Sequence, residues 1–345
     1  MNLLYLAVSQ KTVRGRSVLI VCCLLLFAVL FRPAAAQDSL FYIFSRSTPP
    51  STISRSLAGA GTALPFGGFQ GIVNPALTTA AGAAARGVLS AGYGRDPAFD
   101  RLALPFGAVF AENQGALGAF YRYLNGSQGT VHDGVLNLAG RMFEQVDKQG
   151  PVEFGLNIRY EQSKWRRRFP VPDDGGEETA EVTAYAKNIL FDIGFYQPYV
   201  LPGLDFSLVA TNLNGYRWLE SGITEKQRGW MGLKYCSVIV GAAYSLPLMN
   251  GNLLFQLPLD MEFANLFNKS VKNNTAIRTG LDTRIMQMFN ARFGYAHAPE
   301  DPLGLIKDFD YKNLFFGGIG VFVKPVQLDF FAGKDEFGVT ASYWY

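Results

Sequence analysis

The chain has 345 residues, of which 49% are hydrophobic and 17% are charged, and its formal net charge is +3. A net charge this small gives no reason to expect binding to nucleic acid. Apart from one run near the N-terminus, no apolar stretch approaches the length of a membrane-spanning helix, so the composition favours a sheet protein whose two faces differ.

The first 36 residues have the three parts of a secretory signal. Lys11, Arg14 and Arg16 are its basic residues, an apolar run extends from Val18 to Phe31, and small residues follow at 33–37. We therefore expect this segment to be removed on export. A retained anchor helix is the alternative, although the run is shorter than the roughly 20 residues that a bilayer core requires.

The segment 37–85 that follows is rich in small and flexible residues. Gly59 and Gly61 let the backbone bend and approach another surface closely. Pro75 fixes its own φ and keeps Asn74 extended. So much glycine and proline is not typical of an array of strands.

From residue 86 to residue 345 the sequence alternates apolar with polar or small residues in short segments, which is the pattern of strands with one apolar face. Turn-forming residues such as Asn125-Gly126-Ser127 and Met249-Asn250-Gly251 separate these segments. The predicted strands are 87–95, 101–111, 116–124, 131–143, 152–163, 182–197, 204–213, 230–246, 253–265, 277–283, 291–297, 314–323, 326–333 and 337–345.

This pattern predicts an all-β protein, a transmembrane antiparallel β-barrel of about 14 strands. A β-sandwich would also alternate, but the export signal, the strand lengths and the aromatic residues near strand ends favour the membrane. In the last strand Phe337, Tyr343 and Tyr345 share one face. They resemble the terminal signature of bacterial outer-membrane proteins that the barrel-assembly machinery recognises, although most such proteins end in Phe.

Counting strands from a periplasmic N-terminus places two long polar connections, residues 164–181 and 215–226, on the extracellular rim. The first contains Trp165, Arg166, Arg167 and Arg168, and the second contains Trp218. The arginines suit the phosphates of lipopolysaccharide, and a solvated loop whose charges pair with each other is the alternative. The stretch Pro299 to Asp310 is expected on the periplasmic side.

No arrangement of residues points to enzymatic chemistry. The two histidines, His132 and His297, have no neighbours at the spacing of a metal site, and no nucleophile motif accompanies them. Cys236 is the one cysteine left after the signal is removed, so an internal disulfide is excluded. We therefore expect no catalytic residue, no metal and no cofactor, and two histidines that belong to the barrel or its loops.

The stretch 55–65, followed by Asn74-Pro75-Ala76, resembles the N-terminal motif that the FadL-type transporters share with the PorV/PorQ-type proteins. In those families a glycine-rich segment precedes an Asn-Pro-Ala triplet. Residues 66–71 depart from the motif, because acidic residues usually stand there. Weaker likenesses at 205–213 and 279–295 extend the resemblance over much of the chain, and the length after removal of the signal favours the PorV/PorQ-type group.

The resemblance implies that residues 37–85 form a plug inside a fourteen-stranded barrel formed by residues 86–345. Extra edge strands or a disordered lead are the alternatives for the plug. Asn74-Pro75-Ala76 would act as its hinge or anchor, with the Asn side chain bonded to the wall or to a plug amide. The residues expected in the plug and along a ligand path are Leu57, Gly59, Gly61, Leu64, Phe66, Phe69, Asn74, Pro75, Ala76 and Leu77.

The function that the resemblance implies is passage of hydrophobic small molecules across the bacterial outer membrane. The alternative is a non-enzymatic component of type IX secretion, in which the rim around Arg166 and Trp218 would hold secreted partners at the cell surface. A general porin is a third reading, but a plug would obstruct an aqueous channel. The expected partners are outer-membrane lipid, the barrel-assembly machinery, and either a hydrophobic ligand or secretion-system proteins.

Overall fold

The computed structural model describes residues 52–65, 67–79, 86–96, 101–112, 115–126, 129–142, 151–172, 177–221, 227–233, 235–264, 266–267, 274–299, 311–334 and 336–345. The expected signal and Phe66 lie outside these ranges.

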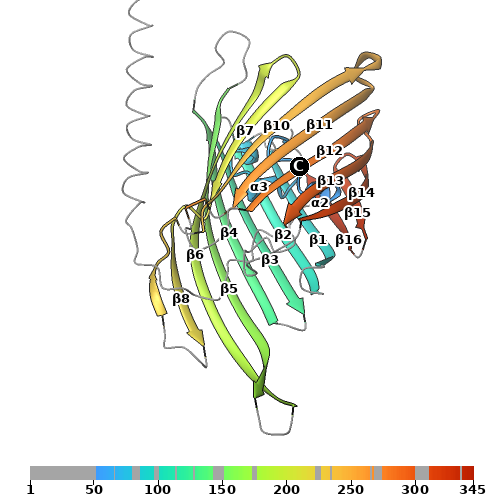
Figure 1. The fold of residues 1–345 in the computed structure, drawn as a ribbon. Coiled ribbons are helices and arrows are strands. Elements are labelled where there is room, and N and C mark those ends of the chain that lie inside the picture. The colour runs from blue at the N-terminus through green and yellow to red at the C-terminus, as the bar shows by residue number, and fades with distance from the viewer. Residues whose placement is uncertain are drawn as a thin grey trace, which may run out of the picture.

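Strands dominate the described residues, and they form one antiparallel sheet (Figure 1). Fourteen strands close into a ring, because β1 pairs with β16 and β5 pairs with β6. This confirms the fourteen-stranded antiparallel barrel. The ring consists of β1 Gly87–Asp96, β2 Arg101–Glu112, β3 Gly115–Gly126, β4 Gly129–Arg141, β5 Glu153–Pro172, β6 Glu177–Leu201, β7 Leu204–Thr211, β10 Ser237–Leu248, β11 Leu253–Ala264, β12 Asn274–Ile285, β13 Phe289–Pro299, β14 Tyr311–Val323, β15 Val326–Gly333 and β16 Phe337–Trp344.

Two further strands, β8 Gly215–Ser221 and β9 Gln227–Trp230, form a ribbon beside β6. Strand β8 continues along β6 where β7 stops, after a break at Asn212, whose φ of 51° lies in the left-handed region. Strand β9 ends at Trp230, and β10 begins only at Ser237, which pairs with Thr211 at the end of β7. The prediction of one strand over 230–246 and a loop over 215–226 is therefore wrong.

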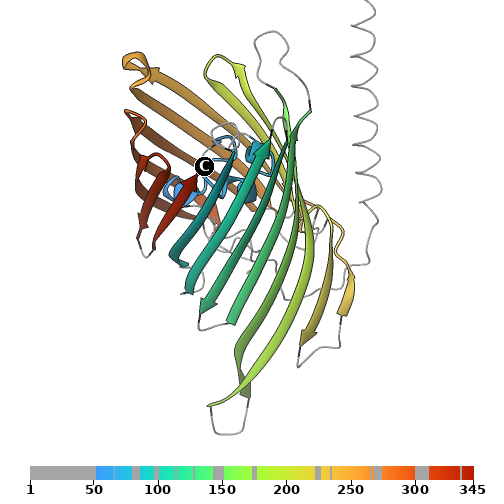
Figure 2. The same cartoon turned by 180° about the vertical axis from the view of Figure 1, so that it is seen from behind.

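Strands β5 and β6 are 20 and 25 residues long and extend well beyond their neighbours as one hairpin (Figures 1 and 2). Trp165 and the arginines at 166–168 lie within strand β5, and Trp218 lies within β8, so none of them is in a loop as predicted. The side chains at 165–168 lie outside what the structure describes.

The two ends of the barrel differ. The terminal end carries Gly87 and Tyr345, whose backbones exchange two hydrogen bonds of 3.1 and 3.0 Å. The hairpin end is the opposite one, where β5 and β6 project. Short turns such as Pro202-Gly203 and Lys324-Pro325 lie at the terminal end. Because β13 and β14 pair from Pro299 to Tyr311 at the hairpin end, their connection begins and ends opposite Gly87 and Tyr345, and not at the same end as the termini as expected.

The barrel wall has one apolar and one polar face. On β4, for example, Leu136 and Leu138 are 46% and 47% exposed on the outside, whereas the adjacent Asn137 is fully buried inside. The last strand follows the same rule, since Phe337, Tyr343 and Tyr345 are all about half exposed and Trp344 points inward. Within the described part of the chain, no helix is long and apolar enough to cross a membrane.

Candidate functional site: the plug and the barrel interior

Residues 52–65 and 67–79 form a plug that lies inside the ring (Figures 1 and 2). Most of the side chains described in these two ranges are buried. The plug contains two short helices, α2 Thr52–Ser56 and α3 Gln70–Val73, joined by turns. Gly59 and Gly61 have φ angles of 88° and 138°, which L side chains rarely adopt, so glycine is required where the chain reverses after α2.

Asp260 of β11 holds the first turn of the plug. Its carboxylate accepts hydrogen bonds from the backbone N–H groups of Gly61 (2.9 Å) and Thr62 (3.0 Å) and from the Thr62 hydroxyl (2.7 Å). The Ser207 hydroxyl donates to Thr62 Oγ1 at 2.9 Å. A buried carboxylate is costly unless donors surround it, so the three donors make this position specific for an acid.

Two of the wall residues next to the plug near this turn are glycines. A Cβ atom at Gly241, next to Asp260 on the sheet, would lie 2.0 Å from Thr62 Oγ1. Similarly, a Cβ at Gly294 would lie 2.3 Å from the backbone of Leu57. The plug backbone therefore fits directly against the wall backbone at these points.

The Asn74-Pro75-Ala76 triplet forms the second anchor. The Asn74 amide nitrogen donates to the carbonyl oxygens of Thr62 (2.9 Å) and Phe195 (3.2 Å), and its side-chain oxygen accepts from the N–H of Ala76 at 3.1 Å. Asn74 thus bonds both the plug and strand β6 of the wall, as its extended backbone allows. A Cβ at Gly194 would lie 2.0 Å from Asn74 Oδ1, so this contact also requires glycine in the wall.

Three more ties join the plug to the wall. Asn137 donates to the carbonyl of Pro75 at 3.1 Å, Asn157 donates to the carbonyl of Gly71 at 3.0 Å, and Arg55 forms an ion pair with Glu336. Four of the plug–wall contacts end on plug backbone atoms, at Gly61, Thr62, Gly71 and Pro75. The wall residues that make them were not among the candidates from the sequence.

The apolar side chains of the plug pack in clusters against the wall. Phe69 and Ile72 pack with Val88, Phe120 and Trp344, among others. A second cluster contains Leu57 and Leu64, and Leu77 packs with Tyr196. Every described member of the expected ligand path is covered by protein in this arrangement, apart from Gly59, which is partly exposed.

Charged side chains line the interior between the plug and the hairpin end. Cross-strand register places Arg122, Asp133, Glu161, Asn188 and Arg217 side by side on five strands, and we call this set the charged row. Within it Arg122 lies 3.1 Å from Asp133, and Asn188 donates to Glu161 at 2.9 Å. All five residues are at most 6% exposed.

Arg159, two residues along β5 from Glu161 of the charged row, is fully buried and pairs with Asp192 at 2.7 Å. On the other side of the barrel, Arg292 pairs with Asp282 at 3.0 Å and with Asp329 at 2.7 Å. Because buried charges are tolerated only when paired, these groups tie neighbouring strands to one another. The interior surface is therefore polar, in contrast to the apolar outside.

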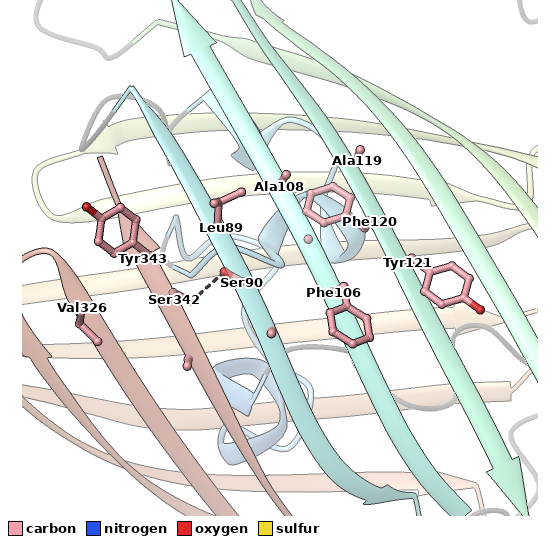
Figure 3. Close-up of a pocket in the computed structure, with 13 residues that line it drawn as sticks. Leu89, Ser90, Phe106, Ala108, Ala119, Phe120, Tyr121, Val326, Ser342 and Tyr343 are labelled. Atoms are coloured by element: carbon pink, nitrogen blue, oxygen red, sulfur yellow. Dashed lines mark hydrogen bonds between the residues drawn. The ribbon is translucent and has the colours of Figure 1, made fainter.

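The outer face of the wall has an apolar hollow of about 570 Å³ over β15, β16, β1, β2 and β3 (Figure 3). Alanines such as Ala108 and Ala119 form its floor, and Leu89, Phe106 and Tyr121 stand around it. Directly behind it, the ring of plug residue Phe69 lies against Gly107, where a Cβ would be only 2.9 Å away. The wall between the outside and the plug is thin here.

The two histidines lie on the outer surface near the hairpin end. His132 Nδ1 is 2.7 Å from the hydroxyl of Tyr121, and His297 Nδ1 is 2.9 Å from Asn313 Oδ1. Cys236 has a buried thiol, whose Sγ lies 4.0 Å from the carbonyl oxygen of Ser237. Among the residues that the structure describes, no group of three or more His, Cys, Asp or Glu side chains is placed to hold a metal ion.

No protein-family model and no curated protein matches the sequence. Solved structures do match. The toluene transporter TodX of P. putida has a TM-score of 0.59 at 10% identity, over 85% of this chain and 98% of that one. The CymD monoaromatic hydrocarbon channel has a TM-score of 0.57 at 12% identity, over 85% and 97%. A Pseudomonas aeruginosa FadL homologue has a TM-score of 0.55 at 11% identity, over 85% and 97%.

The chain has the fold of FadL-type channels. At 10–12% identity the likeness concerns the fold, and it covers most of this chain and nearly all of each channel. The preference for the PorV/PorQ-type group, which depended on length, is not supported by these comparisons.

Proposed function

We propose that this protein carries hydrophobic small molecules, with monoaromatic hydrocarbons as the first class to test, across the bacterial outer membrane. The observation that carries the proposal is the docked plug: a folded segment occupies the barrel and is held by a few hydrogen bonds, several of them to its backbone. The matching structures named as a monoaromatic hydrocarbon channel and a toluene transporter supply the substrate class.

In the proposed mechanism the plug must shift before a molecule passes. Leu57, Leu64, Phe69 and Leu77 are at most 1% exposed, so a ligand reaches them only after the plug separates from the wall. An apolar ligand gains about 25 cal/mol for each Å² that it buries, and this gain favours the shifted plug. The path then leads through the barrel or sideways through its wall.

We also propose a role for each segment of the chain and an orientation of the barrel in the membrane. The segment 1–36 acts as the export signal and residues 37–85 as the plug segment. The terminal end faces the periplasm, because short turns are typical of that side. Phe337, Tyr343 and Tyr345 form the signal for the barrel-assembly machinery. The protein itself performs no catalysis and needs no cofactor.

The test is binding and uptake with the full chain. Purified protein in detergent is titrated with a fluorescent fatty acid, which is then displaced by toluene, and toluene entry is followed in cells that produce the protein. We expect saturable, competitive binding and faster entry than in cells without it. Absence of saturable binding together with unchanged entry would remove the proposal.

A further inference from the structure

The outer face of strands β5, β6, β8 and β9 carries aromatic and basic side chains close together. Direct cross-strand pairs place Lys187 beside Trp218 and Trp218 beside Arg228, and Lys164 beside Tyr185. Paired residues in an antiparallel sheet point to the same side. These side chains therefore form one surface near the hairpin end, which we call the outer aromatic patch, and it consists of Lys164, Tyr185, Lys187, Tyr216, Trp218, Arg228 and Trp230.

The aromatic rings of the patch hold one another. Tyr216 lies 4.4 Å from Trp218 and 5.4 Å from Trp230, measured between ring centroids. Trp230 is 55% exposed and Tyr185 is 45% exposed. Tyr and Trp rings at such a level are typical of the boundary between the apolar band of a barrel and the lipid headgroups.

The position along the strands agrees with a membrane boundary. On β6 the outward residues change from Phe191 and Ile189 to Lys187 and Tyr185 toward the hairpin end. The same change occurs on β3, where Leu117 is followed by tyrosines. Such a change from apolar to aromatic and basic side chains is typical of the level where acyl chains end and headgroups begin.

The charge of the patch is positive. Lys187 and Arg228 are exposed, and Lys164 Nζ lies 5.4 Å from the centroid of the Tyr185 ring. Glu220, opposite Tyr185 on β8, is the acidic side chain on this face among those residues of β5, β6, β8 and β9 whose side chains the structure describes. Lys164 and Lys187 are diagonal neighbours on adjacent strands, about 7–8 Å apart at their Cα atoms, so they can share one phosphate group.

The level of the patch elsewhere on the barrel is different. Near the hairpin end of β12, β13 and β14, the cross-strand row of Ile277, His297 and Asn313 carries no lysine or arginine. Clustered cations beside exposed aromatic rings therefore mark one side of the wall, not the whole boundary.

We propose that the outer aromatic patch binds the phosphorylated glycolipid of the outer leaflet. Lys164, Lys187 and Arg228 contact its phosphate groups, while Trp218 and Trp230 pack against its sugars and the first carbons of its acyl chains. The proposal depends on the outer-membrane location but not on transport. It assigns to this face a bound lipid that anchors the projecting β5–β6 hairpin and the β8–β9 ribbon at the surface.

The test uses the full protein in detergent and native mass spectrometry with added lipid A. We expect lipid A with its phosphates to bind, and dephosphorylated lipid A to bind at least about tenfold more weakly, since a hydrogen bond between charged groups is worth about this factor. A double variant, Lys187→Gln with Arg228→Gln, should lose binding to a similar extent, and Lys187→Arg should retain it.

The controls are Lys334→Gln, which removes an exposed charge at the hairpin end of β15, and Lys324→Gln, which does so at the terminal end. Both should bind lipid A like the unchanged protein. Equal binding by the double variant, or by dephosphorylated lipid A, would overturn the proposal. Toluene displacement by the same variants is measured separately, so failure of lipid binding is distinguished from failure of transport.

Discussion

Replacing Asp260 by Asn should loosen the plug. The carboxylate accepts three hydrogen bonds from Gly61 and Thr62, and the neutral amide retains an acceptor oxygen but also presents N–H groups to these donors. Hydrogen bonds to a charged group contribute about 1.5–3 kcal/mol each, and an unmatched buried donor costs about 1–3 kcal/mol. We therefore expect plug docking to weaken by about 2 kcal/mol, which raises the population of the shifted plug about 30-fold.

Hydrogen exchange at the amides of Gly61 and Thr62, followed by mass spectrometry, measures this change directly. When the plug closes faster than an exposed amide exchanges, the exchange rate follows the population of the shifted plug, so exchange should accelerate by about the same factor. Toluene entry into cells should become faster as well, because less binding energy is needed to shift the plug.

Asp205→Asn is the matched control. Asp205 also accepts a backbone N–H, from Tyr199 at 2.9 Å, and a hydroxyl, from Tyr196 at 2.9 Å, but both partners belong to the wall. This variant should leave plug exchange and toluene entry unchanged. Unaltered exchange at Gly61 and Thr62 in Asp260→Asn would refute the role given to Asp260. Faster exchange with unaltered entry would instead refute the link between plug movement and passage.

Three further changes test the packing of the plug and the wall. Gly194→Ala places a Cβ 2.0 Å from Asn74 Oδ1 and should displace the Asn-Pro-Ala turn, seen as increased protease cleavage near it, whereas Gly229→Ala, with no atom within 4 Å, should have no effect. Asn74→Ala removes the bonds to Thr62 and Phe195 and should accelerate amide exchange in both segments by roughly tenfold or more. Arg159→Met leaves the Asp192 carboxylate buried without its ion-pair partner and should lower barrel stability by about 3–5 kcal/mol, measured by urea unfolding into and out of lipid, while Lys334→Met should change it little.

The strands and their order could be predicted from sequence because each depends on local patterns. Alternation is visible within a strand, and residues such as Pro202-Gly203 mark the turns. The break between β9 and β10 could not be placed from local pattern, because residues 230–246 are apolar throughout most of their length. The two strands are separate because β9 pairs with β8 whereas β10 pairs with β7, and such pairing between segments is not visible in the local sequence.

The contacts that anchor the plug also join segments that are far apart in the sequence, so they could not be predicted from local patterns. The Asn-Pro-Ala triplet is visible as a motif, but its partners are not. Asp260 is separated from Thr62 by 198 positions, and nothing in strand β11 distinguishes this acid from any other polar residue that faces a barrel interior. The charged row is likewise invisible until register brings Arg122, Asp133 and Arg217 to the same level.

The energetics favour a partial shift of the plug over its release. Neutral amide side chains form several of the ties: Asn137 and Asn157 donate to plug carbonyls, and the plug residue Asn74 donates to the carbonyl of Phe195. Water can replace each of these bonds when the plug moves, so each contributes only about 1 kcal/mol net. An aromatic ring that buries about 150–250 Å² gains about 4–6 kcal/mol. This gain is comparable to the loss of a few ties but not to the separation of both apolar clusters. A single small ligand can therefore displace the anchor at Asn74, whose bonds are between neutral groups, while the rest of the plug stays docked.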